Sequence, residues 1–247
     1  MTTPKIIACI PARYASSRFK AKLMQPLGSK SVIRHTYDNT LATGLFAQVI
    51  VITDSELIYN EITQYGGTAI MSIALHESGS DRIAEAVASL DVDIIINVQG
   101  DEPFVQKQPL QELITCMVKN RDVQVASLML ATTNEALIQN PNEAKVVIDV
   151  NNNAILMSRS PIPYILNPEA ELTYYLHIGV YGYTKAALLQ FSKWPLSPLE
   201  NAEKLEQLRF IQNGMPIKMV LTTHYNGIAI DVPSDLIQAE KILTNQP

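Results

Sequence analysis

The sequence predicts an α/β fold with a mostly parallel, open sheet and helices on both of its faces. Short apolar runs typical of buried strands alternate with segments of helical spacing up to about residue 132. The chain has 247 residues, of which 47% are hydrophobic and 17% charged, so it can build a large core. Alternating strands and helices favour a parallel sheet because each crossover helix returns the chain to the end of the sheet where the previous strand began, so the next strand runs in the same direction.

Each strand of the first part is a short apolar run, and each helix has a recognisable start or stop. Gly44 and the pair Gly66-Gly67 are suited to end the first two helices, and Asp54 or Ser55 is suited to cap the second. The expected strands are Ile6–Ile10, Val49–Thr53, Ala69–Ser72, Asp93–Val98 and Val123–Ala131, and the expected helices are Val32–Leu41, Glu56–Tyr65, Ser80–Ala88 and Pro109–Lys119.

The pattern changes after residue 132. The turn Asn151-Asn152-Asn153 predicts a hairpin between Ala144–Val150 and Ala154–Ser158. The remaining expected elements are the strands Tyr174–Tyr183, Ile217–Leu221 and Ile228–Val232 and the helices Lys185–Ser192, Asn201–Gln212 and Ser234–Leu243. We expect a single domain, 1–247, in which residues 132–215 form an inserted lid or dimer surface.

Composition excludes several classes of function. The net charge of −5 argues against a general binder of nucleic acid or anionic membranes. No apolar run approaches the roughly 20 residues that span a bilayer, and the N-terminus lacks the pattern of a signal peptide, so we expect a cytoplasmic protein. Cys9 and Cys116 stand far apart in apolar surroundings, which predicts two buried thiols rather than a disulfide or a metal pair.

A basic turn follows the first expected strand. Residues 11–22 contain Arg13, Arg18, Lys20 and Lys22 but no acid and no glycine. Because ligands of open α/β sheets bind at the carboxyl ends of the strands, we interpret this turn as a clamp for a polyanion such as a nucleoside triphosphate. A solvated basic loop is the alternative. Neither a G-x-G-x-x-G turn nor a G-x-x-x-x-G-K-[ST] loop is present, so side chains must neutralise the phosphates.

Acidic residues follow other strands. Asp101 lies in the segment Asn97–Pro103, directly after an apolar strand, and is the first candidate ligand for Mg²⁺. Its neighbour Glu102 either supports that ligand or is a solvated loop acid. Asp231 ends the expected strand Ile228–Val232 and is the second candidate. It is also suited to cap the last helix, and the two roles are compatible.

A third motif, Ser78-Gly79-Ser80, precedes a helix whose free N–H groups can meet a ligand, although it also fits an ordinary capped helix start.

These motifs occur in one order with S-R-S-P-I-P at Ser158–Pro163, H-I-G-V-Y-G-Y at His177–Tyr183 and L-E-Q-L-R at Leu205–Arg209. In this combination, over essentially the whole chain, the sequence resembles the 3-deoxy-manno-octulosonate cytidylyltransferases, or CMP-Kdo synthetases. The resemblance implies a fold of the nucleotide-diphospho-sugar transferase type. It also implies transfer of CMP from CTP to the anomeric hydroxyl of Kdo, with release of pyrophosphate, for lipopolysaccharide synthesis. Mg²⁺ and a homodimer are implied as well.

The resemblance assigns roles residue by residue. The implied CTP-binding residues are Pro11, Ala12, Arg13, Arg18, Lys22, Ser78 and Arg82. The implied sugar-acid residues are Gln99, Arg159, His177, Tyr181 and Glu206. Asp101 and Asp231 are the implied metal ligands, and with Arg13 and Lys22 they form the implied catalytic set. Without the resemblance, His177 is as well explained as a packed core histidine, and Glu206 as a surface partner of Glu203 and Arg209 on one helix.

The sequence departs from the family pattern in three places. Lys20-Ala21-Lys22-Leu23 replaces the usual proline-glycine-lysine-proline, so we expect an altered turn backbone. Tyr164–Pro168 is nearly uncharged, and Thr184 replaces a common arginine. These changes leave two alternative sugars in place of Kdo, namely 8-amino-Kdo or another 2-keto sugar acid such as a sialic-acid-like sugar. A third alternative is that the protein is a nucleotide-binding sensor without catalysis. A glycosyltransferase is disfavoured because the only D-x-D motif, Asp91-Val92-Asp93, precedes a strand.

Overall fold

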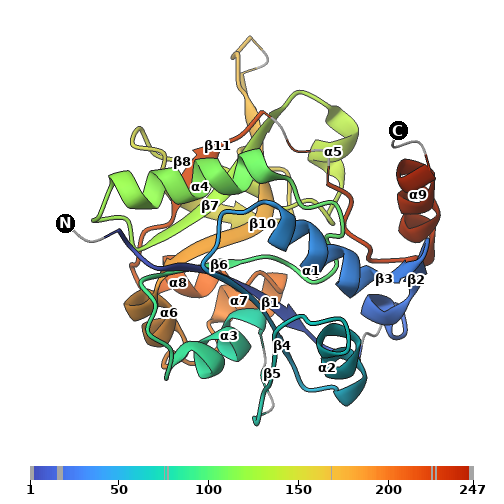
Figure 1. The fold of residues 1–247 in the computed structure, drawn as a ribbon. Helices are drawn as coiled ribbons and strands as arrows, with labels where there is room; N and C mark the ends of the chain where they lie inside the picture. The colour runs from blue at the N-terminus through green and yellow to red at the C-terminus, as the bar shows by residue number, and fades with distance from the viewer. Residues whose placement is uncertain are drawn as a thin grey trace. The chain divides into compact units, whose positions relative to one another are not determined.

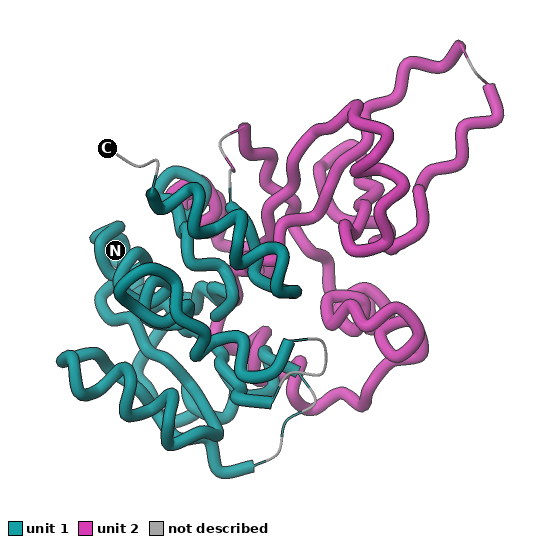
Figure 2. The backbone as a smooth tube through the Cα atoms, turned by 90° about the vertical axis from the view of Figure 1, so that its right-hand side faces the viewer, with its two compact units in different colours: residues 1–110, 226–247 teal, residues 111–225 magenta. Residues whose placement is uncertain are grey.

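The computed structural model describes residues 3–15, 19–74, 76, 78–167, 169–223, 225 and 227–244. The chain divides into two compact units, coloured separately in Figure 2. Unit 1 consists of residues 1–110 and 226–247, and unit 2 of residues 111–225. The segment 132–215, which we expect to be an insertion in a single domain, falls within unit 2, and the domain assignment itself stays a prediction.

Unit 1 is a parallel α/β layer structure. Its strands lie in the order β6 (Ile94–Asn97), β1 (Ile6–Ala12), β4 (Gln48–Thr53) and β5 (Ala69–Met71), and every neighbouring pair is parallel. Its longer helices are α1 (Val32–Ala42), α2 (Glu56–Thr63), α3 (Gly79–Val87) and α9 (Pro233–Thr244). Branched apolar side chains on the strands are buried, as expected for a sheet covered on both faces.

The direction of the crossovers reverses once in unit 1. From β1 the chain passes through α1 to β4 and through α2 to β5, whereas α3 carries it back to β6 on the other side of β1. Right-handed crossovers therefore place α1 and α2 on one face and α3 on the other, as Figure 1 shows. The point of reversal lies between β1 and β6, which is where open α/β sheets bind ligands. The predicted α/β fold with parallel strands is thus confirmed.

Three short elements of unit 1 follow β1 and are not expected from the sequence. They are the 3-10 helix η1 (Lys22–Met24) and the two-residue strands β2 (Pro26–Leu27) and β3 (Lys30–Ser31). Elements of two or three residues leave no periodic pattern to recognise. Ser31 then caps α1 by accepting from the backbone N–H of Arg34.

Unit 2 is built on a mixed sheet. Strand β7 (Val125–Thr132) pairs in parallel with β11 (Lys218–Leu221) and antiparallel with β10 (Tyr174–Thr184). The predicted hairpin is confirmed as β8 (Lys145–Ile148) and β9 (Ala154–Ser158), and β8 also pairs with β10. The remaining helices are α4 (Lys107–Lys119), α5 (Glu135–Gln139), α6 (Lys185–Phe191), α7 (Pro198–Glu203) and α8 (Leu208–Gln212).

One predicted helix is wrong in its extent. Residues 201–212 form the end of α7 and the whole of α8, separated at Lys204, which has the left-handed φ of 53°. The helix begins earlier because Ser197 and Glu200 form a capping box with Pro198 at the first helical position. The left-handed residue then ends α7, so Glu203, Glu206 and Arg209 do not share one helix face.

The predicted strand Ile228–Val232 is also wrong, because residues 227–232 form no strand. Among the described residues, a backbone hydrogen bond from Ile230 N to Asp101 O, at 2.9 Å, links this segment to the turn after β6. Asp235, the third residue of α9, stabilises the start of this helix: its Oδ2 accepts from the backbone N–H groups of Asp231 and Val232, both at 2.9 Å. Alternating apolar residues before a helix therefore mimicked a strand in the sequence pattern.

Both cysteines are free, as predicted, but only Cys9 is buried and Cys116 is half-buried. Among the described helices, none has the length and apolarity needed to cross a membrane.

Candidate active site

Unit 1 contains a polar pocket of about 230 Å³ at the point where the crossovers reverse. It is lined by the residues that follow β1, those that follow β6, and the start of α3. All described members of the predicted CTP set line it, namely Pro11, Ala12, Arg13, Lys22, Ser78 and Arg82. Gln99 and Asp101 line it as well. The remaining member, Arg18, lies outside the described residues.

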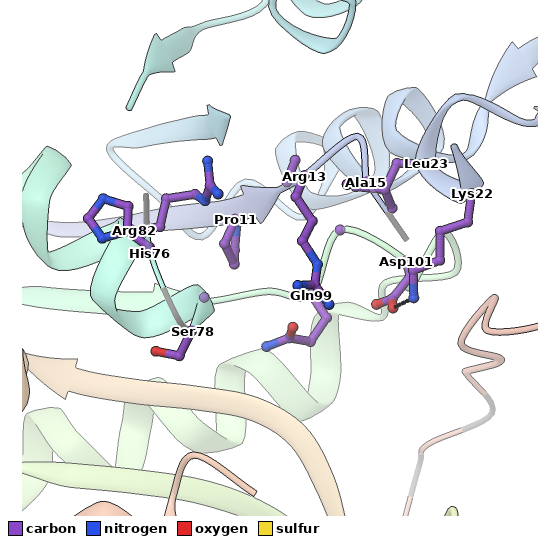
Figure 3. A pocket seen from close by; sticks show the side chains of 13 residues that line it. Pro11, Arg13, Ala15, Lys22, Leu23, His76, Ser78, Arg82, Gln99 and Asp101 are labelled. Atoms are coloured by element: carbon purple, nitrogen blue, oxygen red, sulfur yellow. Dashed lines mark hydrogen bonds and ion pairs between the residues drawn. The ribbon is translucent and has the colours of Figure 1, made fainter. Parts of the chain in front are cut away.

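The pocket has two chemically different ends, separated in the view of Figure 3. His76, Ser78 and Arg82 lie at one end, and Lys22 and Asp101 at the other, with Arg13 and Gln99 between them. A long ligand with a neutral and a charged end would therefore meet different side chains along its length.

At the charged end, Lys22 lies between the two predicted metal ligands. Its Nζ donates to Asp101 Oδ2 and, at 2.9 Å, to Asp231 Oδ1. Burial lowers the pKa of Lys22, but the charges of Asp101 and Asp231 and the hydrogen bonds to both outweigh it, so the pKa lies above its ordinary value. The ammonium group is thus a firm cation that pairs with both carboxylates, and its single positive charge offsets one of their two negative charges.

The turn that carries Asp101 is fixed by its neighbours on the backbone. The Thr36 hydroxyl of α1 donates to Gly100 O at 2.9 Å. A side chain at Gly100 would place its Cβ 3.1 Å from Pro11 O, so any other residue would push β1 and this turn apart by a few tenths of an ångström. The bond from Ile230 N to Asp101 O brings the segment with Asp231 to the same place.

Ala21 keeps a left-handed backbone at the position where the family pattern has glycine. Its φ is 51° and its ψ 35°, and its carbonyl accepts from Met24 N at 2.8 Å within η1. The expectation of an altered turn rested on the missing glycine, yet alanine adopts the conformation in which glycine is favoured.

The opposite end of the pocket is held by groups that the sequence did not single out. Arg82 is buried and donates to Asp54 Oδ2 at 2.8 Å and to Ser72 Oγ at 2.7 Å. Ser78 caps α3, as its alternative interpretation predicts, by accepting from Asp81 N at 3.1 Å.

The approach to α3 is held by Glu85, which accepts from Ile73 N at 2.8 Å and pairs with His76 Nε2. Asp54 and Glu85 stand in ordinary helical or turn contexts, so no local motif could reveal their roles.

The carboxylates of this pocket fit a magnesium ion that is completed by a substrate phosphate. Asp101 and Asp231 converge on one ammonium group, which shows that both can face a single cation. The described residues hold no group of three or more His, Cys, Asp or Glu side chains arranged for a metal. Magnesium commonly uses one or two carboxylates with phosphate oxygens and water. Glu102 is buried, so its interpretation as a solvated loop acid is wrong.

The predicted sugar-acid residues fall into two groups. Gln99 belongs to unit 1, where its Nε2 donates to Asn97 Oδ1 at 3.3 Å. Arg159, His177, Tyr181 and Glu206 all belong to unit 2.

In unit 2 the ring of His177 contacts polar groups through both nitrogens. Burial lowers its pKa to about 4, so the ring is neutral near pH 7. Its Nε2 lies 2.9 Å from Ser127 Oγ, which is also 2.9 Å from Val180 O. Its Nδ1 lies 3.5 Å from Gln207 Nε2.

The turn between α7 and α8 connects these residues. Glu203 accepts from Arg159 N at 2.6 Å through its carboxylate and from Arg159 Nε at 2.7 Å through its backbone carbonyl. Gln207 approaches His177, and Glu206 lies half-buried between Glu203 and Gln207. The break that the sequence analysis missed thus gathers three of the four residues around one turn.

The fourth, Tyr181, is 4% exposed, and its ring centroid lies 5.3 Å from that of His177. Its predicted contact with the sugar stays a prediction.

Comparison with known proteins agrees with this geometry. A family model for cytidylyltransferases matches residues 7–218. A 3-deoxy-manno-octulosonate cytidylyltransferase of Flavobacterium johnsoniae is 55% identical over 97% of this chain and 98% of its own. The chain belongs to the 3-deoxy-manno-octulosonate cytidylyltransferase family.

Other members of this family support the assignment. The enzyme of Christiangramia forsetii is 45% identical, with 97% of each chain covered. A solved structure of a CMP:2-keto-3-deoxy-manno-octonic acid synthetase in complex with CTP matches with a TM-score of 0.91 and 35% identity, covering 97% of this chain and 98% of that one.

Proposed function

We propose that this protein transfers CMP from CTP to the anomeric hydroxyl of 3-deoxy-D-manno-octulosonate, forming CMP-Kdo and pyrophosphate. The observation that carries the proposal is the convergence of Lys22, Asp101 and Asp231 at the charged end of a pocket that sits at the reversal point of the sheet. That pocket belongs to a chain of the cytidylyltransferase family.

The reaction needs no nucleophile from the enzyme, because the sugar hydroxyl attacks the α-phosphorus of CTP. The bond from that phosphorus to the pyrophosphate oxygen breaks, and the negative charge leaves with pyrophosphate. Catalysis then consists of positioning and charge neutralisation. Arg13 and Lys22 are the described cations that line the pocket at the level of the phosphates, and Arg82 and Ser78 lie at the end suited to the cytosine.

Asp101 and Asp231 are the residues that would hold Mg²⁺. When bound, the ion supplies charge neutralisation on the phosphates and lowers the pKa of a coordinated hydroxyl. Lys22, which bridges both carboxylates, would then be available to the triphosphate as a cation.

Arg159, His177 and Glu206 are the proposed contacts of the sugar acid in unit 2. The Arg159 guanidinium suits a sugar carboxylate because it can donate two parallel hydrogen bonds to it. His177 is neutral near pH 7 because its pKa is lowered, so it suits hydrogen bonding to sugar hydroxyls better than charge attraction.

We further propose a cytoplasmic homodimer that activates Kdo for lipopolysaccharide synthesis. Support for the dimer comes from the loop after β9, where Tyr164 and Leu166 are 85% and 84% exposed. Large apolar side chains exposed together in one loop are typical of an interface, and a second copy of the chain is the occupant that the family resemblance implies.

A pyrophosphate-release assay with a panel of nucleoside triphosphates and sugar acids tests the function. We expect activity with CTP, Mg²⁺ and Kdo, and at least tenfold lower kcat/KM with ATP, GTP or UTP. Higher kcat/KM with 8-amino-Kdo or a sialic-acid-like sugar would reassign the sugar but keep the reaction. If CTP binds but no sugar acid leads to release of pyrophosphate from it, the protein is better explained as a nucleotide-binding sensor.

A further inference from the structure

Lys145 is a buried cation that no part of the proposed reaction uses. It is the first residue of β8, opposite Ser158 of β9, and its relative exposure is 0%. A lysine whose whole side chain is removed from water is costly to keep, and an apolar residue of similar length would fill the same space. Such a residue calls for a structural or functional reason.

The ammonium group of Lys145 is fully used by main-chain carbonyls. Its Nζ donates to Asn140 O at 3.0 Å, to Glu143 O at 2.6 Å and to Arg159 O at 2.5 Å. An ammonium group has three N–H bonds, so each of them has an acceptor. Lys145 thereby connects the loop before β8 to the backbone of Arg159.

Arg159 is held by the same loop from the other direction. Its Nη1 donates to Pro141 O at 2.9 Å, and Pro141 lies between the two loop residues whose carbonyls Lys145 binds. Its Nε donates to Glu203 O at 2.7 Å, and its backbone N–H to the Glu203 carboxylate at 2.6 Å.

These contacts fix the plane of the guanidinium group without using all of it. Two of its five N–H bonds go to main-chain carbonyls, and the other three have no acceptor among the described residues. The guanidinium is therefore oriented rigidly, yet it keeps enough donors for a carboxylate of a ligand.

We propose that Lys145 and Glu203 are positioning residues that clamp Arg159 from its two sides and so orient its guanidinium group for the carboxylate of the sugar acid. This inference rests on the proposed function, since it takes the sugar acid as the ligand of Arg159. In this proposal neither residue touches the substrate, and both act through Arg159. Loss of either contact would let the guanidinium group shift, and a misplacement of about 1 Å is enough to weaken the productive binding of the sugar acid.

The test compares the steady-state kinetics of Lys145→Met and Glu203→Gln with those of the unaltered protein. The temperature is one at which circular dichroism shows all three proteins to be folded. We expect the KM for Kdo to rise about tenfold in Lys145→Met and severalfold in Glu203→Gln, whereas the KM for CTP stays within about twofold. Glu203→Gln keeps the volume of the side chain, so it gives an answer even where Lys145→Met does not fold.

Lys218→Met is the matched control. Lys218 is also a lysine of unit 2 whose Nζ donates to a main-chain carbonyl, that of Asn151, but it has no link to Arg159. We expect both KM values to stay unchanged in this variant.

The decisive measurement places each change in an Arg159→Ala background. If Lys145 and Glu203 act through Arg159, the double variants have the same KM for Kdo as Arg159→Ala alone. Additive effects, or equal rises in the KM of both substrates, would mean that the two residues only stabilise the fold and would overturn the proposal. An unchanged KM for Kdo in Arg159→Ala itself, with pyrophosphate still released, would overturn this inference while the proposed function stands.

Discussion

The charged cluster beside the pocket of unit 1 and the buried ion pair of unit 2 differ in their exposure to water. In unit 1 the side chains of Lys22, Asp101 and Asp231 are 17%, 22% and 36% exposed, and Lys22 and Asp101 line the pocket. In unit 2 the side chains of Arg209 and Glu200 are 3% and 5% exposed, and Lys145 is fully buried. Charges that still touch water can exchange their protein partners for a ligand, whereas buried charges are held by their partners and fix the shape around them.

The largest effect is expected at the charges of unit 1. Asp101→Asn should lower kcat by about a thousandfold or more, because it removes one of the two carboxylates proposed for Mg²⁺. CTP should still bind detectably in calorimetry, since Arg13 and Lys22 remain. Asp91→Asn, at a fully exposed carboxylate of the same unit, is the control and should leave kcat unchanged. Full activity of Asp101→Asn would remove Asp101 from the metal site.

The next effect concerns the stability of unit 2. Arg209 donates from Nη2 to Glu200 Oε1 at 2.6 Å and from Nε to Glu200 Oε2 at 2.7 Å. Glu200→Gln removes the negative charge of this carboxylate from beside the buried guanidinium and should lower the free energy of unfolding by about 3–5 kcal/mol.

Urea unfolding followed by fluorescence is well suited to this measurement, because the only tryptophan, Trp194, packs on Phe210 beside Arg209. In unit 1, Asp38→Asn removes a partly exposed pair with Lys30 and Arg34 and should cost about 1 kcal/mol or less. Equal losses in the two variants would contradict the contrast between the units.

A third effect makes the stability of unit 2 depend on pH. The folded pKa of His177, about 4, lies below its ordinary value of 6.5, so the unfolded chain binds more protons between these values. The contribution is fully present above pH 6.5 and is lost as the pH falls towards 4, by roughly 3 kcal/mol.

His177→Gln cannot take up this proton. The difference in unfolding free energy between the original protein and this variant should therefore shrink from pH 7 to pH 4 by about that amount. A constant difference over this range would mean that the pKa of His177 is not lowered in the folded protein.

The contrast between the units also explains what the sequence could predict. The charges of unit 1 follow strands β1 and β6, and the carboxyl ends of parallel strands meet at one edge, so Arg13, Lys22 and Asp101 could be placed together from sequence position alone. Asp231 was placed correctly for the wrong reason, since no strand precedes it and a backbone hydrogen bond from Ile230 to Asp101 brings it to the site.

The buried network of unit 2 could not be found in this way. Lys145 and Arg159 are 14 residues apart, and many partners in this network are main-chain carbonyls, which leave no trace in residue type. A lone lysine at the start of an apolar strand was the one available signal. The break at Lys204 was missed for a related reason, because a left-handed residue other than glycine carries no sequence signature.

The smallest predicted effect is at Ala21, where the turn of unit 1 retains a left-handed residue without glycine. Ala21→Gly should relieve about 1–2 kcal/mol of steric cost in the folded state. It also gives the unfolded chain more freedom, worth about 0.4–1 kcal/mol, so the net gain in unfolding free energy should be roughly 0.5–1 kcal/mol.

Ala42→Gly, at an exposed position of α1 with ordinary helical backbone, is the matched control and should instead lose about 0.5–1 kcal/mol. Urea unfolding followed by circular dichroism measures both. If Ala21→Gly destabilised the protein as much as Ala42→Gly does, the backbone at residue 21 would not be left-handed in solution. We expect the two changes in unfolding free energy to have opposite signs. This result would indicate that the hydrogen bonds of η1, and not the residue type at position 21, impose the shape of the turn that directs Lys22 towards Asp101 and Asp231.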